Sequence, residues 1–287
     1  MITETKEQIK NQLEKFVNQV GGQMAASKRL QGVSNATISN IINGKWENIG
    51  DAMWNSIANQ FRGKSSEKWI VDTTTERMLK MTKHYNDAKD HAIVFCLIGA
   101  AGSGKTTPAK LFADQQGVFL VKCKEYLNRQ SFLVELLESM GMKDCFGYTV
   151  HELMRKAIGV LNRSKNPVII LDEADKLTDQ ALCFFITIYN ETEDKCGLIM
   201  QATDHLAKRI KRGVEQNKKG YKEIYSRIGR KFVDVPENSR EELLRIVKLN
   251  GVADEGEAIR IVNDSDGDIR RIKRLVFAYN RKMEEAE

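Results

Sequence analysis

The spacing of apolar residues changes twice along the 287 residues of this chain. Up to about residue 61, apolar side chains recur every three or four positions, as with Ile9, Leu13 and Phe16, which is typical of amphipathic helices. From Ala92 onward, short runs that are apolar throughout alternate with helical segments, and such runs predict strands buried on both faces. After Pro236 the spacing is helical again. The pattern predicts a helical N-terminal region, an α/β middle and a helical C-terminal region.

The N-terminal region predicts an all-α domain over residues 1–63. Gly21 and Gly22 end its first helix, and Ser34 is a candidate N-cap for the third. The expected helices cover 3–20, 24–30, 35–43 and 53–61. Residues 64–75 are polar and lack helical periodicity, so they predict a linker.

The middle of the chain, residues 76–237, predicts an α/β domain built on a parallel sheet. A helix from Thr75 to about Lys89 opens it, and further helices separate the strands. The expected strands cover 92–98, 118–121, 168–171, 197–202 and 232–235. Residues 238–287 follow as a small helical lid, where Ser239 and Glu242 match a capping box.

A glycine-rich loop follows the first strand directly. Residues 99–106 read GAAGSGKT and match G-x-x-x-x-G-K-[ST] at every fixed position. Backbone N–H groups of such a loop surround phosphates, Lys105 reaches the β- and γ-phosphates, and the Thr106 hydroxyl binds Mg²⁺. A chance turn is disfavoured, because a buried strand precedes the loop and a helical pattern containing Pro108 follows it. A nucleoside triphosphate is expected at Gly99, Ala100, Ala101, Gly102, Ser103, Gly104, Lys105, Thr106 and Thr107.

Acidic side chains follow the third expected strand. Val168–Leu171 is wholly apolar and leads into Asp172 and Glu173. Because ligands bind at the carboxyl edge of a parallel sheet, we expect Asp172 to hold Mg²⁺ and Glu173 to polarise the attacking water. The alternative is a strand that ends in solvated acids, which a phosphate loop upstream disfavours. Thr203, at the end of the 197–202 strand, is placed to orient the same water.

Two basic stretches lie in the α/β domain. One follows the second strand, and the other runs from His205 to Lys231 with many cations and few acids. Such stretches are suited to binding DNA phosphates whatever the base sequence. Any single lysine could equally belong to a solvated face. The candidate DNA contacts are Lys122, Lys124, Arg129, Lys208, Arg209, Lys211 and Arg212.

Composition narrows the setting of the chain. The net charge of +6 is compatible with an anionic partner but does not require one. The polar N-terminus and the lack of long apolar runs predict a soluble, cytoplasmic protein without a signal peptide. Five cysteines without CxxC pairing predict buried thiols in preference to zinc ligands or disulfides. They are Cys96, Cys123, Cys145, Cys183 and Cys196.

The phrase GVSNATISNIINGKW, residues 32–46, resembles the second half of a Cro/repressor-type helix-turn-helix. In that family the second helix enters the major groove. The resemblance implies DNA contacts by Asn35, Ala36, Thr37 and Asn40, with Lys45 near a phosphate. The small residue usual before the turn is replaced by Lys28, so the turn is expected to be one residue longer. A helical bundle that docks on another protein is the alternative.

The order of the remaining motifs resembles that of AAA+ ATPases. The phosphate loop is followed by LDEAD at 171–175, a polar strand end, SRIGR at 226–230 and GDIRR at 267–271. The resemblance implies Thr203 as sensor 1, Arg227 (with Arg230 as the alternative) as the arginine finger, and Arg270 as sensor 2.

The whole chain resembles the MuB family, the target-DNA-capturing ATPases of Mu-type transposable phages. The segments that carry this resemblance are ATISNIING, IILDEAD, the GLIM strand and IYSRIGRK. The resemblance implies a homo-oligomer that uses ATP and Mg²⁺ to form filaments on double-stranded DNA, and that delivers this DNA to a DDE transposase. Two alternatives remain open. They are a nucleotide-gated helix-turn-helix transcription regulator and a helicase-loader-like ATPase.

Overall fold

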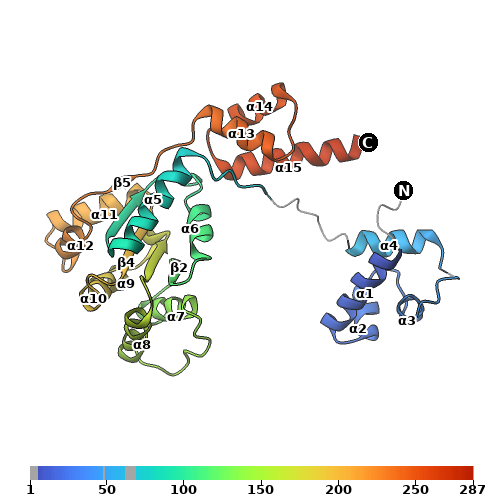
Figure 1. Ribbon diagram of the computed structural model, residues 1–287, viewed down its shortest axis with the longest axis horizontal. Helices are drawn as coiled ribbons and strands as arrows, with labels where there is room; N and C mark the ends of the chain where they lie inside the picture. The colour runs from blue at the N-terminus through green and yellow to red at the C-terminus, as the bar shows by residue number, and fades with distance from the viewer. Residues whose placement is uncertain (1–5, 48, 62–68, 287) are drawn as a thin grey trace. The chain divides into compact units, whose positions relative to one another are not determined.

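The computed structural model describes residues 6–47, 49–61 and 69–286. The chain divides into two compact units, Met1–Trp69 and Ile70–Glu287 (Figure 1). The division falls inside the linker expected at 64–75, and of that linker residues 64–68 lie outside the described residues. No described helix combines the length and the apolar character needed to cross a membrane.

In its described residues, the first unit is a cluster of four helices around one apolar core. Its helices are α1 Lys6–Val20, α2 Gln23–Arg29, α3 Asn35–Ile42 and α4 Asp51–Phe61. Ile9, Leu13, Ile38 and Trp54 lie fully buried in the core, which explains the three- and four-residue spacing of the sequence.

A five-residue connection, residues 30–34, joins α2 to α3. Ser34 caps α3 by accepting a hydrogen bond from the Thr37 N–H at 3.1 Å. From α4, the Gln60 side chain exchanges hydrogen bonds with the backbone N–H and carbonyl of Gln31, at 2.7 and 2.8 Å. These contacts fix the connection that precedes α3.

The second unit contains a five-stranded parallel sheet, as predicted. Its strand order is β2-β3-β4-β1-β5. The strands are β1 Val94–Ile98, β2 Val118–Lys122, β3 Val168–Asp172, β4 Gly197–Ala202 and β5 Val233–Asp234. In register, Asp172 lies beside both Lys122 of β2 and Gln201 of β4.

Helices cover both faces of the sheet (Figure 1). Alternate strand residues, such as Leu97 and Ile170, pack with α5 and α6 in one apolar cluster. The intervening residues, such as Cys96 and Leu171, pack with the helices of the opposite face. Those helices are α7 Arg129–Ser139, α8 Val150–Arg163, α9 Asp179–Leu182, α10 Phe184–Glu191, α11 Asp204–Glu215 and α12 Tyr221–Arg227, while α5 is Glu76–His91 and α6 is Thr106–Ala113.

Some boundaries differ from those expected. The first strand begins at Val94, because Ala92 ends α5 in a left-handed conformation with φ 53°. Between β3 and β4, a 3₁₀ turn at Ala174–Lys176 precedes the two helices α9 and α10. The five thiols are free, four of them buried and Cys183 half-buried, as predicted.

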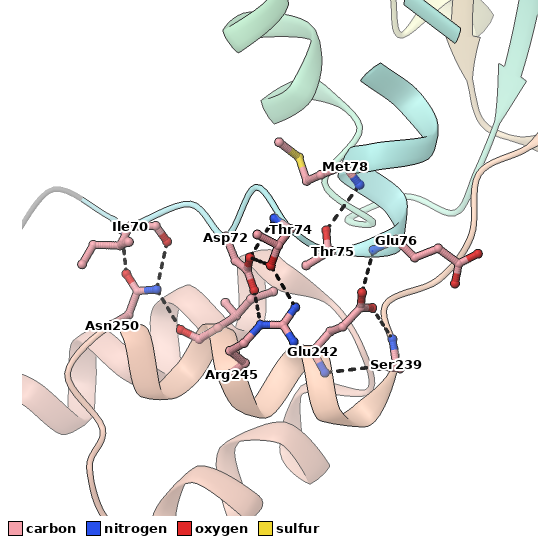
Figure 2. A network of polar contacts seen from close by, with 11 residues as sticks. Ile70, Asp72, Thr74, Thr75, Glu76, Met78, Ser239, Glu242, Arg245 and Asn250 are labelled. Atoms are coloured by element: carbon pink, nitrogen blue, oxygen red, sulfur yellow. Dashed lines mark hydrogen bonds and ion pairs between the residues drawn. The ribbon is translucent and has the colours of Figure 1, made fainter. Parts of the chain in front are cut away.

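The C-terminal helices form the lid, and residues 70–76 are bonded to it (Figure 2). Asn250 exchanges two hydrogen bonds with the backbone of Ile70, at 2.8 and 3.0 Å. Arg245 pairs with Asp72 at 2.6 Å, and Glu242 accepts a hydrogen bond from the Glu76 N–H at 2.6 Å. The second half of the expected linker therefore belongs to the second unit. The lid helices are α13 Arg240–Leu249, α14 Glu255–Ser265 and α15 Ile269–Ala286.

Candidate nucleotide-binding site

The glycine-rich loop connects the end of β1 to the start of α6. Gly102 and Gly104 have φ values of 76° and 90°, which side-chain-bearing residues rarely adopt. Lys105 folds back over the loop, and its Nζ donates to the carbonyl oxygens of Gly99 at 2.7 Å and Ala100 at 2.8 Å. The ammonium group is thus held at the loop by the loop's own backbone. Pro108 occupies the first turn of α6, as expected.

The lid touches this loop through Asp268. A Cβ on Gly102 would come within 2.7 Å of the Asp268 carboxylate, and the φ of 76° independently favours glycine there. Asp268 also caps α15 by accepting a hydrogen bond from the Arg270 N–H at 2.7 Å. The start of the last helix therefore lies against the phosphate loop.

A chain of buried hydrogen bonds runs behind the loop. Thr106 Oγ1 donates to Asp172 Oδ2 at 2.7 Å. Gln201 Nε2 donates to Asp172 Oδ1 at 2.7 Å, and the Tyr85 hydroxyl donates to Gln201 Oε1 at 2.8 Å. Asp172 is 1% exposed, and Gln201 and Tyr85 are fully buried. The carboxylate is thereby fixed on both oxygens.

Gln201 and Tyr85 were missed by the sequence reasoning. The signal for Gln201 was a polar residue inside the apolar run GLIMQA, which indicates a buried side chain that needs a partner. Tyr85 gave no such signal, because an aromatic residue on the inner side of a helix is ordinary core. Its hydroxyl acts here as a donor in the core, and burial together with the charge of Asp172 raises its pKa well above the usual value.

The groups around Thr106 suit a magnesium ion held together with phosphates. In the described part of the chain, no cluster of three or more His, Cys, Asp or Glu side chains could hold a metal by itself. Mg²⁺ commonly takes one or two protein carboxylates and completes its shell with substrate phosphates and water. The pair of Thr106 and Asp172 at the foot of the loop has this character.

Glu173 directly follows β3 in a left-handed conformation, φ 57°. Its carboxylate lies 3.7 Å from Lys122 Nζ and 2.6 Å from Lys176 Nζ. Burial by itself would raise the pKa of Glu173, but these lysines and the charge of Arg270 outweigh burial and lower it. The group is therefore held ionised, as a general base requires.

Lys105 experiences opposing influences. Burial lowers its pKa, Asp172 and Asp175 raise it, and the charges of Arg77 and Arg270 lower it further. Arg270 directly follows Asp268 and Ile269, whose side chains lie next to Gly102 and Gly104, so this lid residue lies close to the phosphate loop. Thr203 Oγ1 donates to Asp175 Oδ2 at 3.0 Å, so it too lies next to the acidic strand end.

The two candidate arginine fingers differ in environment. Arg227 is half-buried, with its guanidinium 4.7 Å from the centre of the Tyr189 ring and Nη2 donating to Asn190 Oδ1 at 2.8 Å. Arg230 is exposed and has φ 57°.

Arg209, one of the expected DNA contacts, is bonded to other side chains of the second unit. Arg209 is bonded inside the unit, to the Asp179 carboxylate at 2.5 Å, to the Tyr221 hydroxyl at 3.0 Å and to the Leu177 carbonyl at 2.6 Å. Counting basic residues could not separate this side chain from its neighbours, because its partners lie on other elements. Arg209 therefore joins α11 to the segment after β3, and its role as a DNA contact stays a prediction.

The other basic candidates are exposed or partly exposed. Lys122 contacts Glu173, Lys124 pairs with Glu135 at 2.5 Å, and Lys208 pairs with Asp204 at 2.5 Å. Lys211 lies over the Phe232 ring, at 5.6 Å from its centre. Arg129 and Arg212 are exposed.

In the first unit, the residues expected to face DNA lie on α3 and just after it. Asn35, Ala36, Asn40 and Lys45 are exposed. Thr37 is half-buried, and its hydroxyl lies 2.8 Å from the Ser34 hydroxyl. The turn before α3 has five residues, in keeping with the longer turn expected.

Comparison with known proteins supports the fold. A family model described as an AAA domain matches residues 87–210, while no curated protein matches. Among solved structures, the Aeropyrum pernix ORC2 protein in its ADP form has 16% identity and a TM-score of 0.56, covering 76% of this chain and 65% of that one.

Two further structures are similar at the same level. The Aeropyrum pernix ORC1 protein in complex with DNA has 17% identity and a TM-score of 0.57, covering 77% and 64% of the two chains. Pyrobaculum aerophilum CDC6P has 16% identity and a TM-score of 0.50, covering 74% and 62%. The chain thus spans less than two thirds of the length of these proteins. The shared feature is the AAA+ P-loop NTPase fold.

Proposed function

We propose that this AAA-domain chain hydrolyses ATP and that its nucleotide state controls its binding to double-stranded DNA. The observation that carries the proposal is the arrangement at the foot of the phosphate loop. There Thr106 and Asp172 lie 2.7 Å apart, and the Glu173 carboxylate is held ionised at the same sheet edge. These are the parts that phosphoryl transfer to water needs.

Each side chain has its own role in the proposed reaction. Lys105 Nζ exchanges its bonds to the carbonyls of Gly99 and Ala100 for phosphate oxygens. Glu173 accepts a proton from the attacking water at a carboxylate oxygen, and Thr203 orients that water. Thr106 and Asp172 would hold Mg²⁺, which when bound neutralises phosphate charge.

Arginines complete the proposed site. Arg270 brings positive charge from the lid to the phosphates, and Arg227 or Arg230 does so from a neighbouring copy of the chain. An arginine supplied between subunits typically contributes about 10³–10⁵ in rate. Hydrolysis that rises more than linearly with protein concentration would support a homo-oligomer.

The DNA part of the proposal rests on the resemblance of residues 32–46 to a helix-turn-helix and on the exposed polar residues of α3. In its finer form, the chain assembles along DNA and delivers it to a DDE transposase, as the resemblance to MuB implies. The transcription regulator and the helicase loader are the competing functions.

Footprinting with electron microscopy separates these functions. Protein, ATP and double-stranded DNA of arbitrary sequence should give continuous coverage and visible filaments if the proposal is correct. One short, sequence-dependent footprint would instead favour the regulator. Nucleotide hydrolysis that does not respond to DNA at all would contradict the coupling between the two activities.

A further inference from the structure

Arg77, in the first turn of α5, is a buried cation that none of the roles above explains. It is 4% exposed, although arginine is rarely buried without a partner for its charge. Nε donates to the Pro236 carbonyl oxygen at 2.7 Å. Nη1 is buried and lacks a hydrogen-bond partner within the described residues. An unsatisfied buried donor of this kind is costly, so an acceptor from outside the chain would complete its surroundings.

Nη1 of Arg77, the nitrogen without a partner, lies next to the phosphate loop. A Cβ on Gly104 would come 3.7 Å from Arg77 Nη1 and 3.9 Å from Ile269 Cγ1. The free donor therefore borders the loop residue that directly precedes Lys105. The charge of Arg77 also contributes to the lowered pKa of Lys105, after the larger effect of burial. The positive charges of Arg77 and Lys105 repel each other, and an anion bound at the loop would offset this repulsion.

Nearby carboxylates do not supply the missing acceptor. Burial lowers the pKa of Arg77, and the charges of Glu237 and Glu242 act against this. Glu242 is already engaged, because its two oxygens accept hydrogen bonds from the Glu76 and Ser239 N–H groups (Figure 2). The acids thus balance part of the charge and leave Nη1 free.

We propose that Arg77 is a phosphate-binding residue, with Nη1 donating to a phosphate oxygen of the nucleotide held by the loop. The inference rests on the proposed function, since it assumes that the loop binds a nucleotide. A guanidinium group is well suited to phosphate. Because Nε holds the Pro236 carbonyl, the same side chain joins a bound phosphate to the segment between β5 and the lid.

The test measures binding of ADP with Mg²⁺ by calorimetry, which needs no turnover. Arg77→Gln should weaken binding by about ten- to hundredfold, the usual worth of a charge-assisted hydrogen bond. Arg77→Lys should recover part of the affinity, because the lysine ammonium group also carries a positive charge that can bind a phosphate. Arg245→Gln, which removes the guanidinium that pairs with Asp72, serves as the matched control and should bind as the wild type does.

The outcomes are distinct. Wild-type affinity in Arg77→Gln, or no recovery in Arg77→Lys, would overturn the assignment. Failure of the wild-type protein to bind ADP would instead refute the proposed function. In case Arg77→Gln does not fold, nitrogen-15 NMR of the wild-type guanidinium groups gives the same decision. The Arg77 signal should shift and its side-chain N–H exchange should slow on addition of ADP, and an unchanged signal would overturn the proposal.

Discussion

The carboxyl edge of the sheet and the outward face of α3 are both expected to meet phosphate-bearing partners, yet they are built in opposite ways. At the edge, Thr106, Asp172 and Gln201 are joined by hydrogen bonds in the interior. On α3, Asn35 and Asn40 project from an apolar core into solvent. One region is ordered before its ligand arrives, whereas the other presents solvated groups.

The difference follows from the ligands. A nucleotide offers few phosphates in a fixed arrangement, so groups positioned in a low-dielectric site interact with it strongly. Duplex DNA offers a long array of phosphates, and its binding draws largely on counterion release by exposed cations. Substitutions at the edge should therefore have large and specific effects, while those at DNA-facing surfaces should act gradually and depend on salt.

Lys105→Ala should have the largest effect. It removes the only side-chain cation of the loop, so ATP affinity should fall by at least about a hundredfold and hydrolysis should cease. DNA binding by the first unit without nucleotide should persist, because α3 and its core are untouched. Titration with a fluorescent ATP analogue and a DNA shift assay would check both. If Lys105→Ala also loses nucleotide-independent DNA binding, the nucleotide site and the DNA-binding surface of α3 are not independent of each other.

Glu173→Gln should separate binding from hydrolysis. ATP affinity should remain near that of the wild type, because Thr106 and Asp172 are unchanged, whereas turnover should fall by about 10²–10⁴. Longer-lived complexes with DNA should result. Single-turnover hydrolysis together with ATP affinity checks this. Normal hydrolysis would mean that another group is the base.

The sequence predicted the architecture well, and for a physical reason. Buried strands, the phosphate loop and the acidic strand end each need particular residue types at fixed spacings, so the five parallel strands and the AAA+ fold follow from local pattern. The exact ends of the helices and strands could not be predicted from this local pattern. Ala92 belongs to the apolar run but ends α5, because the left-handed turn there depends on how α5 packs.

Contacts between distant segments were beyond the sequence. Gln201 and Asp172 meet because of the register between β3 and β4. Tyr85 reaches Gln201 from α5, across a separation of 116 residues in the chain. The bonds of Arg209 to Asp179 and Tyr221 could not be predicted for the same reason, since both partners lie on other elements. Nothing in the sequence around Arg77 indicates that this arginine is buried beside the phosphate loop.

Neutralising three exposed cations of α11, Lys208, Lys211 and Arg212, tests the DNA-facing side of the comparison. For every DNA phosphate that the variant no longer binds, the slope of log affinity against log salt should fall by about 0.9 on duplex DNA, equally for different sequences. ATP affinity should not change. The matched control is the replacement of Lys143, Lys195 and Lys282 by glutamine, which removes the same charge from other helices and loops. An unchanged salt slope in the α11 variant would transfer DNA binding to the first unit and favour the regulator.

Lys176→Met should change the pH dependence of hydrolysis. The contact with Lys176 helps to keep the pKa of Glu173 below its ordinary value, so the base stays ionised as the pH falls. Without this lysine the pKa rises, and the acid limb of the rate profile should move to higher pH while the rate near neutrality changes little. The check is a single-turnover pH series alongside Lys219→Met, which removes an exposed lysine elsewhere. A shift toward lower pH would contradict the role of Lys176.

Tyr85→Phe should have the smallest effect. It tests how far the hydrogen-bonded network at the carboxyl edge of the sheet extends into the core. The substitution keeps the ring in its core position but removes the donor to Gln201 Oε1, leaving one buried acceptor unpaired. The free energy of unfolding should fall by about 1–3 kcal/mol, the cost of an unsatisfied buried group. Gln201 should then hold Asp172 less firmly, so Mg²⁺ dependence of ATP binding should weaken slightly. Chemical denaturation and Mg²⁺ titration measure the two effects. Tyr279→Phe, in the lid, is the control for loss of a hydroxyl outside this chain of bonds. If Tyr85→Phe lowers stability but leaves the Mg²⁺ requirement unchanged, the hydroxyl of Tyr85 contributes to stability alone, and Asp172 and Gln201 are held in place without it.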